Sequence, residues 1–180
     1  MAHLELSDLV AMDSKALDRA MRTGHPMDPS VLAEREYDGV SLNLPRAVER
    51  ITWVKFCKVF HREDGAMRGW NCKVDQTPLE EPWRLTMKNG QPITYGHYGV
   101  VSCKGYRMPR PYGAGLMLDY GLGDNPRLDP TSRMRDPIVA VNEGDSTLLL
   151  GWSYVDMGIS NVGTPSFFAL RRGVELSHIV

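Results

Sequence analysis

The chain has 180 residues and a formal charge of −1, so it lacks the basic excess that is typical of nucleic-acid-binding proteins. Its hydrophobic fraction of 42% and its charged fraction of 24% are those of a globular protein and exclude wholesale disorder. A chain of this length is expected to form one domain. Its 17 glycines and 12 prolines predict many turns, which favours β structure over a helical bundle.

The three cysteines, Cys57, Cys72 and Cys103, are widely spaced and form neither a CxxC pair nor a zinc-finger pattern. We therefore expect reduced thiols, no metal site and a cytoplasmic location, with one catalytic thiol as the alternative. The N-terminus has no basic and apolar signal-peptide pattern, and no apolar run approaches the ~20 residues that cross a bilayer. We expect neither a nucleic acid nor a membrane as a partner.

The apolar residues from Leu6 to Met21 recur at spacings of three to four and predict one helix there. Gly24 and Pro26 are typical of residues that end a helix. Residues 1–30 are therefore expected to form a helical extension of a single domain that covers residues 1–180.

The rest of the chain predicts strands separated by turns, among them a hairpin at Asn89-Gly90 and a tight turn at Glu143–Asp145. Residues 45–61 predict a helix that enters a strand. About eight strands, without helices repeated between them, predict an antiparallel barrel or sandwich and not a doubly wound sheet. The predicted strands are 35–42, 70–74, 83–87, 93–104, 116–120, 138–141, 147–155 and 167–171.

Four stretches resemble the GXWXG-type calycin family, whose members are related to lipocalins and nitrobindins. The first, Arg35-Glu36-Tyr37-Asp38-Gly39, is similar to the family's opening strand, although Arg35 replaces its first glycine and Tyr37 its tryptophan. The others are Trp53–Phe60, then Leu116–Tyr120 with Asp136–Ile138, and finally Asp145–Gly151 with Phe167–Arg172. The resemblance implies a mainly β, lipocalin-like antiparallel barrel of about 8–10 strands with an N-terminal helix. Barrels of this kind serve both binding proteins and enzymes.

Tyr95 and His97 are candidate catalytic residues in the segment from Ile93 to Lys104. Strict alternation puts odd-numbered and even-numbered residues on opposite faces, and Thr94 and Lys104 mark the even face as solvent-exposed. Tyr95 and His97 are therefore expected to point inward. An inward His97 is consistent with a core histidine, an acid–base group, or a metal or haem ligand.

Tyr120 is the third candidate catalytic residue, as a hydrogen-bond donor inside the barrel. Alternation along residues 116–120 places it on the inner face and leaves Asp119 outside as a solvated carboxylate. A register slip of one residue would bury Asp119 instead. The aromatic face of strand 147–155 is expected to form the cavity wall, although a packed core explains it equally well. The candidate ligand-binding residues are Tyr37, Trp53, Phe56, Leu118, Trp152, Tyr154 and Phe168.

These observations favour a small-molecule-binding barrel with an enclosed apolar cavity. Its partner would be a small hydrophobic ligand or substrate, and a homodimer stays open. It could carry the ligand passively, or act as a cofactor-independent isomerase or cyclase on a hydrophobic, secondary-metabolite-like substrate. We expect no cofactor, because the chain has no P-loop and no dinucleotide or hydrolase fingerprint. The alternative is nitrobindin-like haem binding through a histidine.

Overall fold

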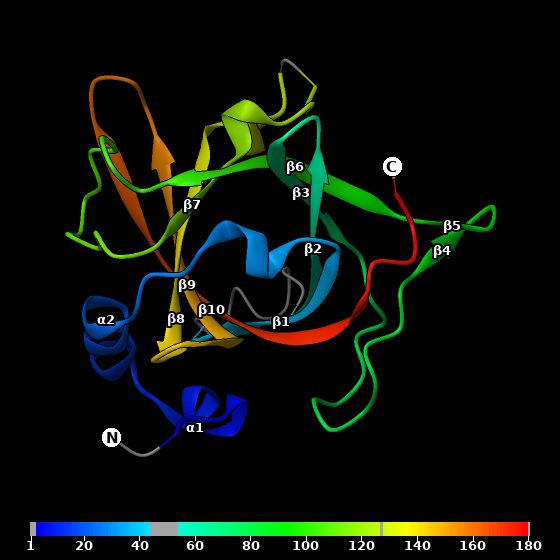
Figure 1. Cartoon of the computed structure of the whole chain (residues 1–180), viewed down its shortest axis with the longest axis horizontal. Helices are drawn as coiled ribbons and strands as arrows, with labels where there is room; N and C mark the ends of the chain where they lie inside the picture. The colour runs from blue at the N-terminus through cyan, green and yellow to red at the C-terminus, as the bar shows by residue number, and fades with distance from the viewer. Residues whose placement is uncertain (1–2, 44–53, 127, 180) are drawn as a thin grey trace.

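The computed structural model describes residues 3–43, 54–126 and 128–179, and it shows eight antiparallel strands closed into a barrel (Figure 1). Each strand of the barrel pairs with the next one along the chain, and the last pairs with the first. The expected mainly β antiparallel barrel is thus confirmed. Its strands are β1 (Arg35–Leu42), β2 (Lys55–Glu63), β3 (Ala66–Cys72), β6 (Thr94–Ser102), β7 (Leu116–Asp119), β8 (Met134–Asn142), β9 (Asp145–Asp156) and β10 (Asn161–Glu175).

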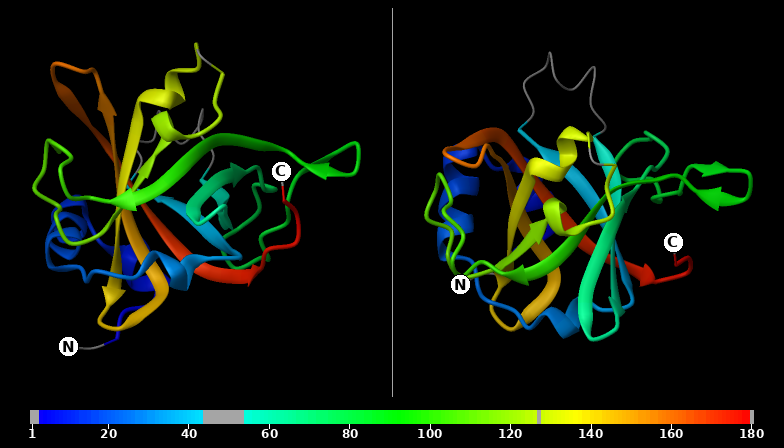
Figure 2. Two further views of the ribbon diagram at one scale, coloured as in Figure 1. Left: turned by 45° about the horizontal axis from the view of Figure 1, so that its top comes forward. Right: turned by 90° about the horizontal axis from the view of Figure 1, so that it is seen from above.

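A separate hairpin of β4 (Met87–Lys88) and β5 (Gln91–Pro92) projects from the barrel (Figure 2). Its turn residues, Asn89 and Gly90, have φ angles of 53° and 80°. Two successive residues with positive φ are what a type I′ hairpin turn requires. The hairpin predicted from the Asn-Gly pair is therefore confirmed.

The N-terminal segment forms two helices, α1 (Leu6–Ala11) and α2 (Ser14–Thr23), and the prediction of one continuous helix was wrong. Met12 is extended, with φ −73° and ψ 141°, and interrupts the helix. The side chain of Asp13 then accepts a hydrogen bond of 2.7 Å from the Ala16 amide, so that Asp13 caps the second helix. The apolar residues keep a helical spacing across the break at Met12 and Asp13, so this spacing alone does not show that the helix is interrupted.

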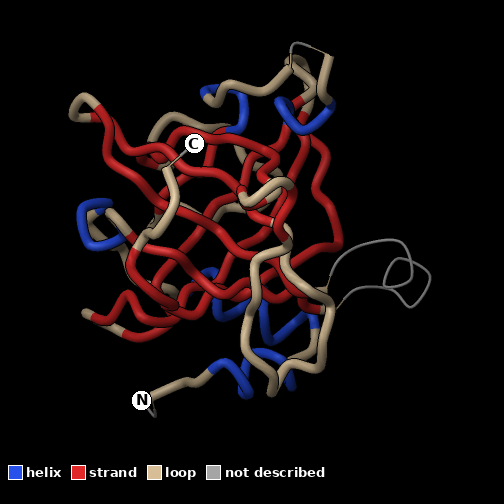
Figure 3. The backbone as a smooth tube through the Cα atoms, turned by 90° about the vertical axis from the view of Figure 1, so that its right-hand side faces the viewer, coloured by secondary structure: helices blue, strands red, loops and turns tan. Residues whose placement is uncertain are grey.

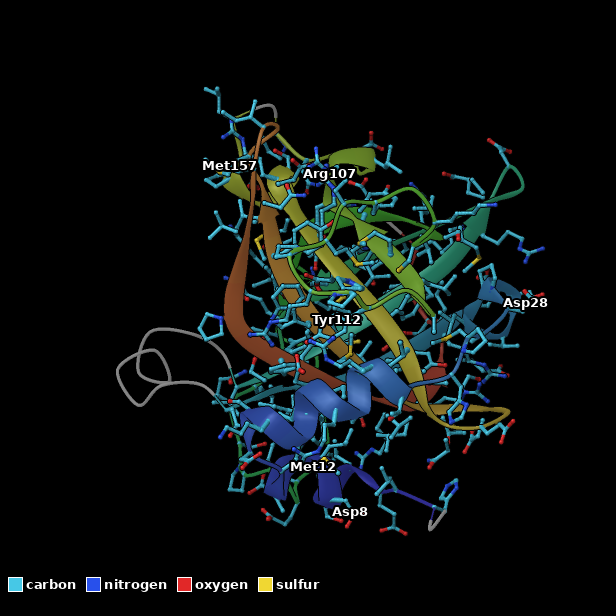
Figure 4. All side chains as sticks on the ribbon, turned by 90° about the vertical axis from the view of Figure 1, so that its left-hand side faces the viewer. Asp8, Met12, Asp28, Arg107, Tyr112 and Met157 are labelled. Atoms are coloured by element: carbon cyan, nitrogen blue, oxygen red, sulfur yellow. The ribbon has the colours of Figure 1, made fainter. Side chains whose placement is uncertain are left out.

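Both helices lie outside the barrel, where α1 contacts β10 and α2 contacts β8 and β9 (Figure 1). They cover an apolar layer that also includes Tyr112, which lies between the helices and the barrel wall (Figure 4). The Tyr112 and Trp152 rings meet edge to face at 5.4 Å. Within the described residues, every helix is too short or too polar to cross a membrane.

A short 3₁₀ turn, η1 (Pro29–Leu32), closes one end of the barrel. Leu32 is fully buried and packs in the interior with Tyr37 and Phe60. The tube view shows that strands form the continuous wall, while helical turns lie outside it or across its ends (Figure 3). The described residues between β7 and β8 lie across the other end of the barrel.

The helical part of the prediction for residues 45–61 lies outside the described residues, and its strand part is β2.

Candidate functional site

A cavity of about 210 Å³ occupies the barrel at the end opposite η1. Its walls combine aromatic rings, hydroxyl groups and two charged side chains. An apolar cavity of about 150 Å³ is known to hold a benzene molecule, so this cavity suits a molecule of about one or two rings. The residues that line it are Ser41, Phe56, Lys58, Asn71, Tyr95, Gly96, Tyr120, Thr131, Met134, Asp136, Ser153, Ser166, Phe167 and Phe168.

Strand alternation directs both charged residues of the cavity inward. Lys58 lies between Phe56 and Phe60 in β2, and all three side chains share the inner face of the barrel. Asp136 occupies the same inward phase near the start of β8. The side chains of Lys58 and Asp136 are only 3% and 5% exposed. A buried charge is expensive unless it is paired, and here one charge compensates the other.

Lys58, Asn71, Tyr120 and Asp136 form one hydrogen-bonded group, which we call the polar cluster. The Lys58 Nζ donates to Asn71 Oδ1 at 2.9 Å and to the Tyr120 hydroxyl at 2.7 Å, and lies 3.4 Å from Asp136 Oδ2. The Tyr120 hydroxyl in turn donates to Asp136 Oδ2 at 2.9 Å. Asn71 Nδ2 donates to the Gly96 carbonyl at 2.9 Å, which fixes the orientation of its amide. All three hydrogens of the Lys58 ammonium thus have an acceptor.

Aromatic rings surround the ammonium group on its remaining sides. The Lys58 Nζ lies 4.9 Å from the centre of the Tyr98 ring and 5.2 Å from that of Phe168. Rings at this distance stabilise a desolvated cation through their negative faces. The Tyr98 hydroxyl points away and donates to the Val59 carbonyl at 2.9 Å. The polar cluster is therefore in contact with aromatic rings, and these rings separate it from the apolar interior of the barrel.

Burial determines the protonation of the cluster. Desolvation lowers the pKa of the Lys58 ammonium, and the nearby Asp136 carboxylate opposes this shift. Desolvation also raises the pKa of the Tyr120 phenol well above its ordinary value, and the charge of Asp136 adds to the effect. Tyr120 consequently keeps its proton and remains a hydrogen-bond donor at neutral pH.

One oxygen of the cluster has no partner. Asp136 Oδ1 is buried and accepts no hydrogen bond from any of the residues that the structure describes. A buried acceptor without a donor costs about 1–3 kcal/mol. Because Asp136 lines the cavity, a bound molecule is a natural source of the missing donor.

Four of the residues expected from the sequence are found together at this cavity. Tyr95, Tyr120, Phe56 and Phe168 all line it. Only Tyr120 belongs to the polar cluster, in which it bridges Lys58 and Asp136.

His97 does not face the cavity, which corrects the expected inward orientation. Asn71 pairs with Tyr95 and Gly69 pairs with Tyr98, so Gly96 and His97 together lie opposite a single residue, Trp70. This is a β-bulge, and Gly96 takes the positive φ of 54° that it requires. The bulge shifts the alternation by one residue, so that Tyr95 and Tyr98 both point inward. The His97 ring lies outside the barrel, 6.1 Å from the Trp70 ring.

The other expected ligand-binding residues that the structure describes lie away from the cavity. Trp152 and Tyr154 face outward into the apolar layer beneath the N-terminal helices, which corrects their assignment to the cavity wall. Tyr37 and Leu118 are inside the barrel but belong to its apolar core, where the Tyr37 hydroxyl donates to the Ser146 carbonyl at 3.0 Å. Trp53 lies outside the described residues.

Asp119 has its side chain outside the barrel, as expected, yet it is not a solvated carboxylate. It is 5% exposed and accepts a hydrogen bond of 2.6 Å from the Tyr106 hydroxyl. Its Oδ1 also lies 3.1 Å from Nε of Arg135. The segment after β6 covers this carboxylate and replaces the solvent.

Sequence reasoning missed Lys58, Asn71 and Asp136. Basic residues among aromatic ones, as around Lys58, are typical of a solvent-exposed face or of a site for an acidic group. The signal was present, because Lys58 shares the period-two phase of the aromatic residues Phe56 and Phe60. A lysine in the apolar phase of a strand indicates a buried cation with a partner elsewhere in the chain.

The segment formed by residues 120–126 and 128–133 covers part of the cavity end. It contains two 3₁₀ turns, η2 (Tyr120–Leu122) and η3 (Pro130–Arg133), and Thr131 lines the cavity. Asn125 fastens the segment to β6, since its Oδ1 accepts from the His97 amide at 2.8 Å and its Nδ2 donates to the His97 carbonyl at 2.7 Å. The same Nδ2 also donates to the Tyr120 carbonyl at 2.8 Å. The segment therefore lies at the cavity end of the barrel.

Comparisons of this chain with protein-family models, with curated proteins and with solved structures found no match. The barrel is consistent with a calycin-like fold. The chain's five histidines all lie within the described residues, and none of them lines the cavity. The geometry therefore offers no histidine for a haem in this cavity.

Proposed function

We propose that the protein binds a small, largely apolar molecule in the barrel cavity. The observation that supports this proposal is the cavity of about 210 Å³, whose wall includes the buried Lys58–Asp136 pair. Ligand sites typically combine mostly apolar walls with a few polar groups that fix orientation. Phe56, Met134 and Phe168 supply the apolar surface, and the polar cluster supplies the fixed groups.

Folding alone does not explain the polar cluster. Replacing a buried ion pair by well-packed apolar residues is often neutral or stabilising for a protein. Here the pair lies beside a cavity and leaves one carboxylate oxygen without a partner. Both features are costs to the folded chain that a bound molecule would offset.

Titration with neutral one-ring and two-ring compounds, naphthalene among them, tests the proposal. At a concentration of about 100 Kd, a ligand should stabilise the fold by about 2.7 kcal/mol, which is measurable as a rise in Tm. Ser153→Leu places bulk in the cavity and should abolish the rise. Ser160→Leu, on the exposed β9–β10 turn, is the matched control and should keep it. Binding that survives Ser153→Leu, or a panel without any binder, would overturn the proposal.

A second candidate function is a cofactor-independent isomerase or cyclase in the same cavity. The observation that favours it is the Tyr120 hydroxyl, which touches both Lys58 Nζ and Asp136 Oδ2. A cation, a phenol and a carboxylate in contact form a chain along which a proton can move. In this version Tyr120 and Asp136 take the acid–base role that we had expected of His97. Once a substrate is found, Tyr120→Phe should lower its turnover about 10²–10⁴-fold while binding persists.

A further inference from the structure

Charge and hydrogen-bond geometry in the cavity restrict the class of ligand. Lys58 and Asp136 are the only charged residues among the described residues that line it, and their charges compensate each other. The Lys58 ammonium has an acceptor for each of its three hydrogens. No hydrogen of that group is left for an anionic ligand.

The acceptor side of the cluster is incomplete. Asp136 Oδ2 receives the Tyr120 hydroxyl at 2.9 Å and lies 3.4 Å from Lys58 Nζ, whereas Oδ1 receives nothing from the described residues. A ligand that brings a hydrogen-bond donor fills this position. A ligand that brings only acceptors leaves it empty, and a carboxylate adds a second negative charge beside it.

We infer that the cavity selects neutral molecules with a hydroxyl or N–H donor, which Asp136 Oδ1 accepts, and that it rejects carboxylates of the same size. This inference rests on the proposed binding function and specifies its ligand class. A hydrogen bond to a charged acceptor is about twice as strong as a neutral one, so a donor on the ligand strengthens binding more than an acceptor does. Rejection of a carboxylate follows from the cost of a buried charge without a counter-ion.

Three probes that share one ring system test the donor preference. They are 2-naphthol, which has a hydroxyl donor, 2-methoxynaphthalene, in which a methyl group replaces the hydroxyl hydrogen, and 2-naphthoate. Calorimetric titration of the wild-type chain at neutral pH should show 2-naphthol binding about 10- to 100-fold more tightly than 2-methoxynaphthalene. The carboxylate should bind most weakly.

Asp136→Asn tests the assigned acceptor. The amide keeps one oxygen for Tyr120 and presents an NH₂ group in place of Oδ1, so the preference for 2-naphthol should be lost. It also leaves Lys58 without a counter-charge, and binding of 2-naphthoate should become tighter than in the wild type. Asp64→Asn makes the same charge change in the exposed β2–β3 turn and should leave all three affinities unchanged.

If Asp136→Asn does not fold, the double variant Lys58→Met with Asp136→Leu takes its place. It removes both charges together and should bind 2-naphthol and 2-methoxynaphthalene within about twofold of each other. The inference is overturned if the wild type binds the ether as tightly as the alcohol, or the carboxylate most tightly; either result leaves cavity binding itself intact. If none of the three probes binds, the inference is overturned. The proposed function is then tested separately, by the titration of the wild type and Ser153→Leu with neutral one-ring and two-ring compounds.

Discussion

The Tyr120 hydroxyl donates to Oδ2 of Asp136 at 2.9 Å, and this bond joins the two ends of the segment that lies over the cavity. Tyr120 follows β7 directly, and Asp136 is the third residue of β8, with its side chain directed inward. The segment between them contributes Thr131 to the cavity wall. The cluster that we assign to ligand recognition therefore also holds the base of the segment that covers the ligand site.

Lys58→Met should destabilise the chain strongly, because it leaves the Asp136 carboxylate buried without a counter-charge. Breaking a buried pair in this way typically costs about 3–5 kcal/mol of unfolding free energy. The double variant with Asp136→Leu removes both charges and should recover most of that loss. Urea unfolding of the wild type, both single variants and the double variant measures the coupling between the residues. If the losses of unfolding free energy in the two single variants add up to the loss in the double variant, the two side chains do not stabilise each other.

Lys58 should also make stability depend on pH in the alkaline range. Its pKa in the fold is lowered by burial from the ordinary lysine value of 10.5. Between those two values the unfolded chain holds a proton that the folded chain releases, so the unfolding free energy rises with pH in this window. The difference in unfolding free energy between the wild type and the Lys58→Met, Asp136→Leu variant should therefore increase as the pH rises toward 10.5. A difference that falls over this range would contradict the assigned burial of Lys58.

Gly96→Ala should damage the cluster through the bulge. A Cβ at this position would lie 2.8 Å from Asn71 Nδ2 and 3.0 Å from a Tyr120 ring carbon. Gly90→Ala is the control, because Gly90 also has positive φ but a Cβ there meets no atom within 4 Å. The left-handed backbone costs both variants roughly 1–2 kcal/mol, and crowding should cost Gly96→Ala about 1–3 kcal/mol more. Equal losses of unfolding free energy would show that the cluster tolerates displacement of Asn71.

Asn125→Ala should loosen the segment over the cavity without opening the barrel. It removes side-chain hydrogen bonds to the His97 and Tyr120 backbone. Amide hydrogen exchange in residues 121–126 and 128–133 should accelerate, while the strands keep their protection. A bound ligand should dissociate faster, which stopped-flow fluorescence measures. Lys88→Ala, in the exposed β4–β5 hairpin, should change neither rate.

Period-two patterns predicted most of the barrel from the sequence. The strand expected at 35–42 is β1 itself, and turn residues correctly indicated the Asn89-Gly90 hairpin. The face of a strand was harder to predict, because the bulge at Gly96 shifts the alternation within β6. That shift explains why Tyr95 was placed correctly and His97 was not.

The polar cluster could not be predicted because its partners come from distant parts of the chain. Lys58 and Asp136 are 78 residues apart, and neither is favourable inside a barrel without the other. Local reasoning therefore treats a charged residue in a strand as solvent-exposed. The aromatic character of its neighbours in the same phase, Phe56 and Phe60, was the local sign that Lys58 faces inward.

Closure of the barrel between β1 and β10 has a consequence for how the chain folds. The paired residues Arg35 and Glu175 are 140 positions apart in the chain, so this seam carries the largest loop-closure entropy of the barrel. Such non-local pairing slows folding, and until it forms, both seam strands expose unpaired edges that can join with other chains. We therefore expect the seam to form late, and aggregation during refolding to increase with protein concentration and to begin at β1 and β10.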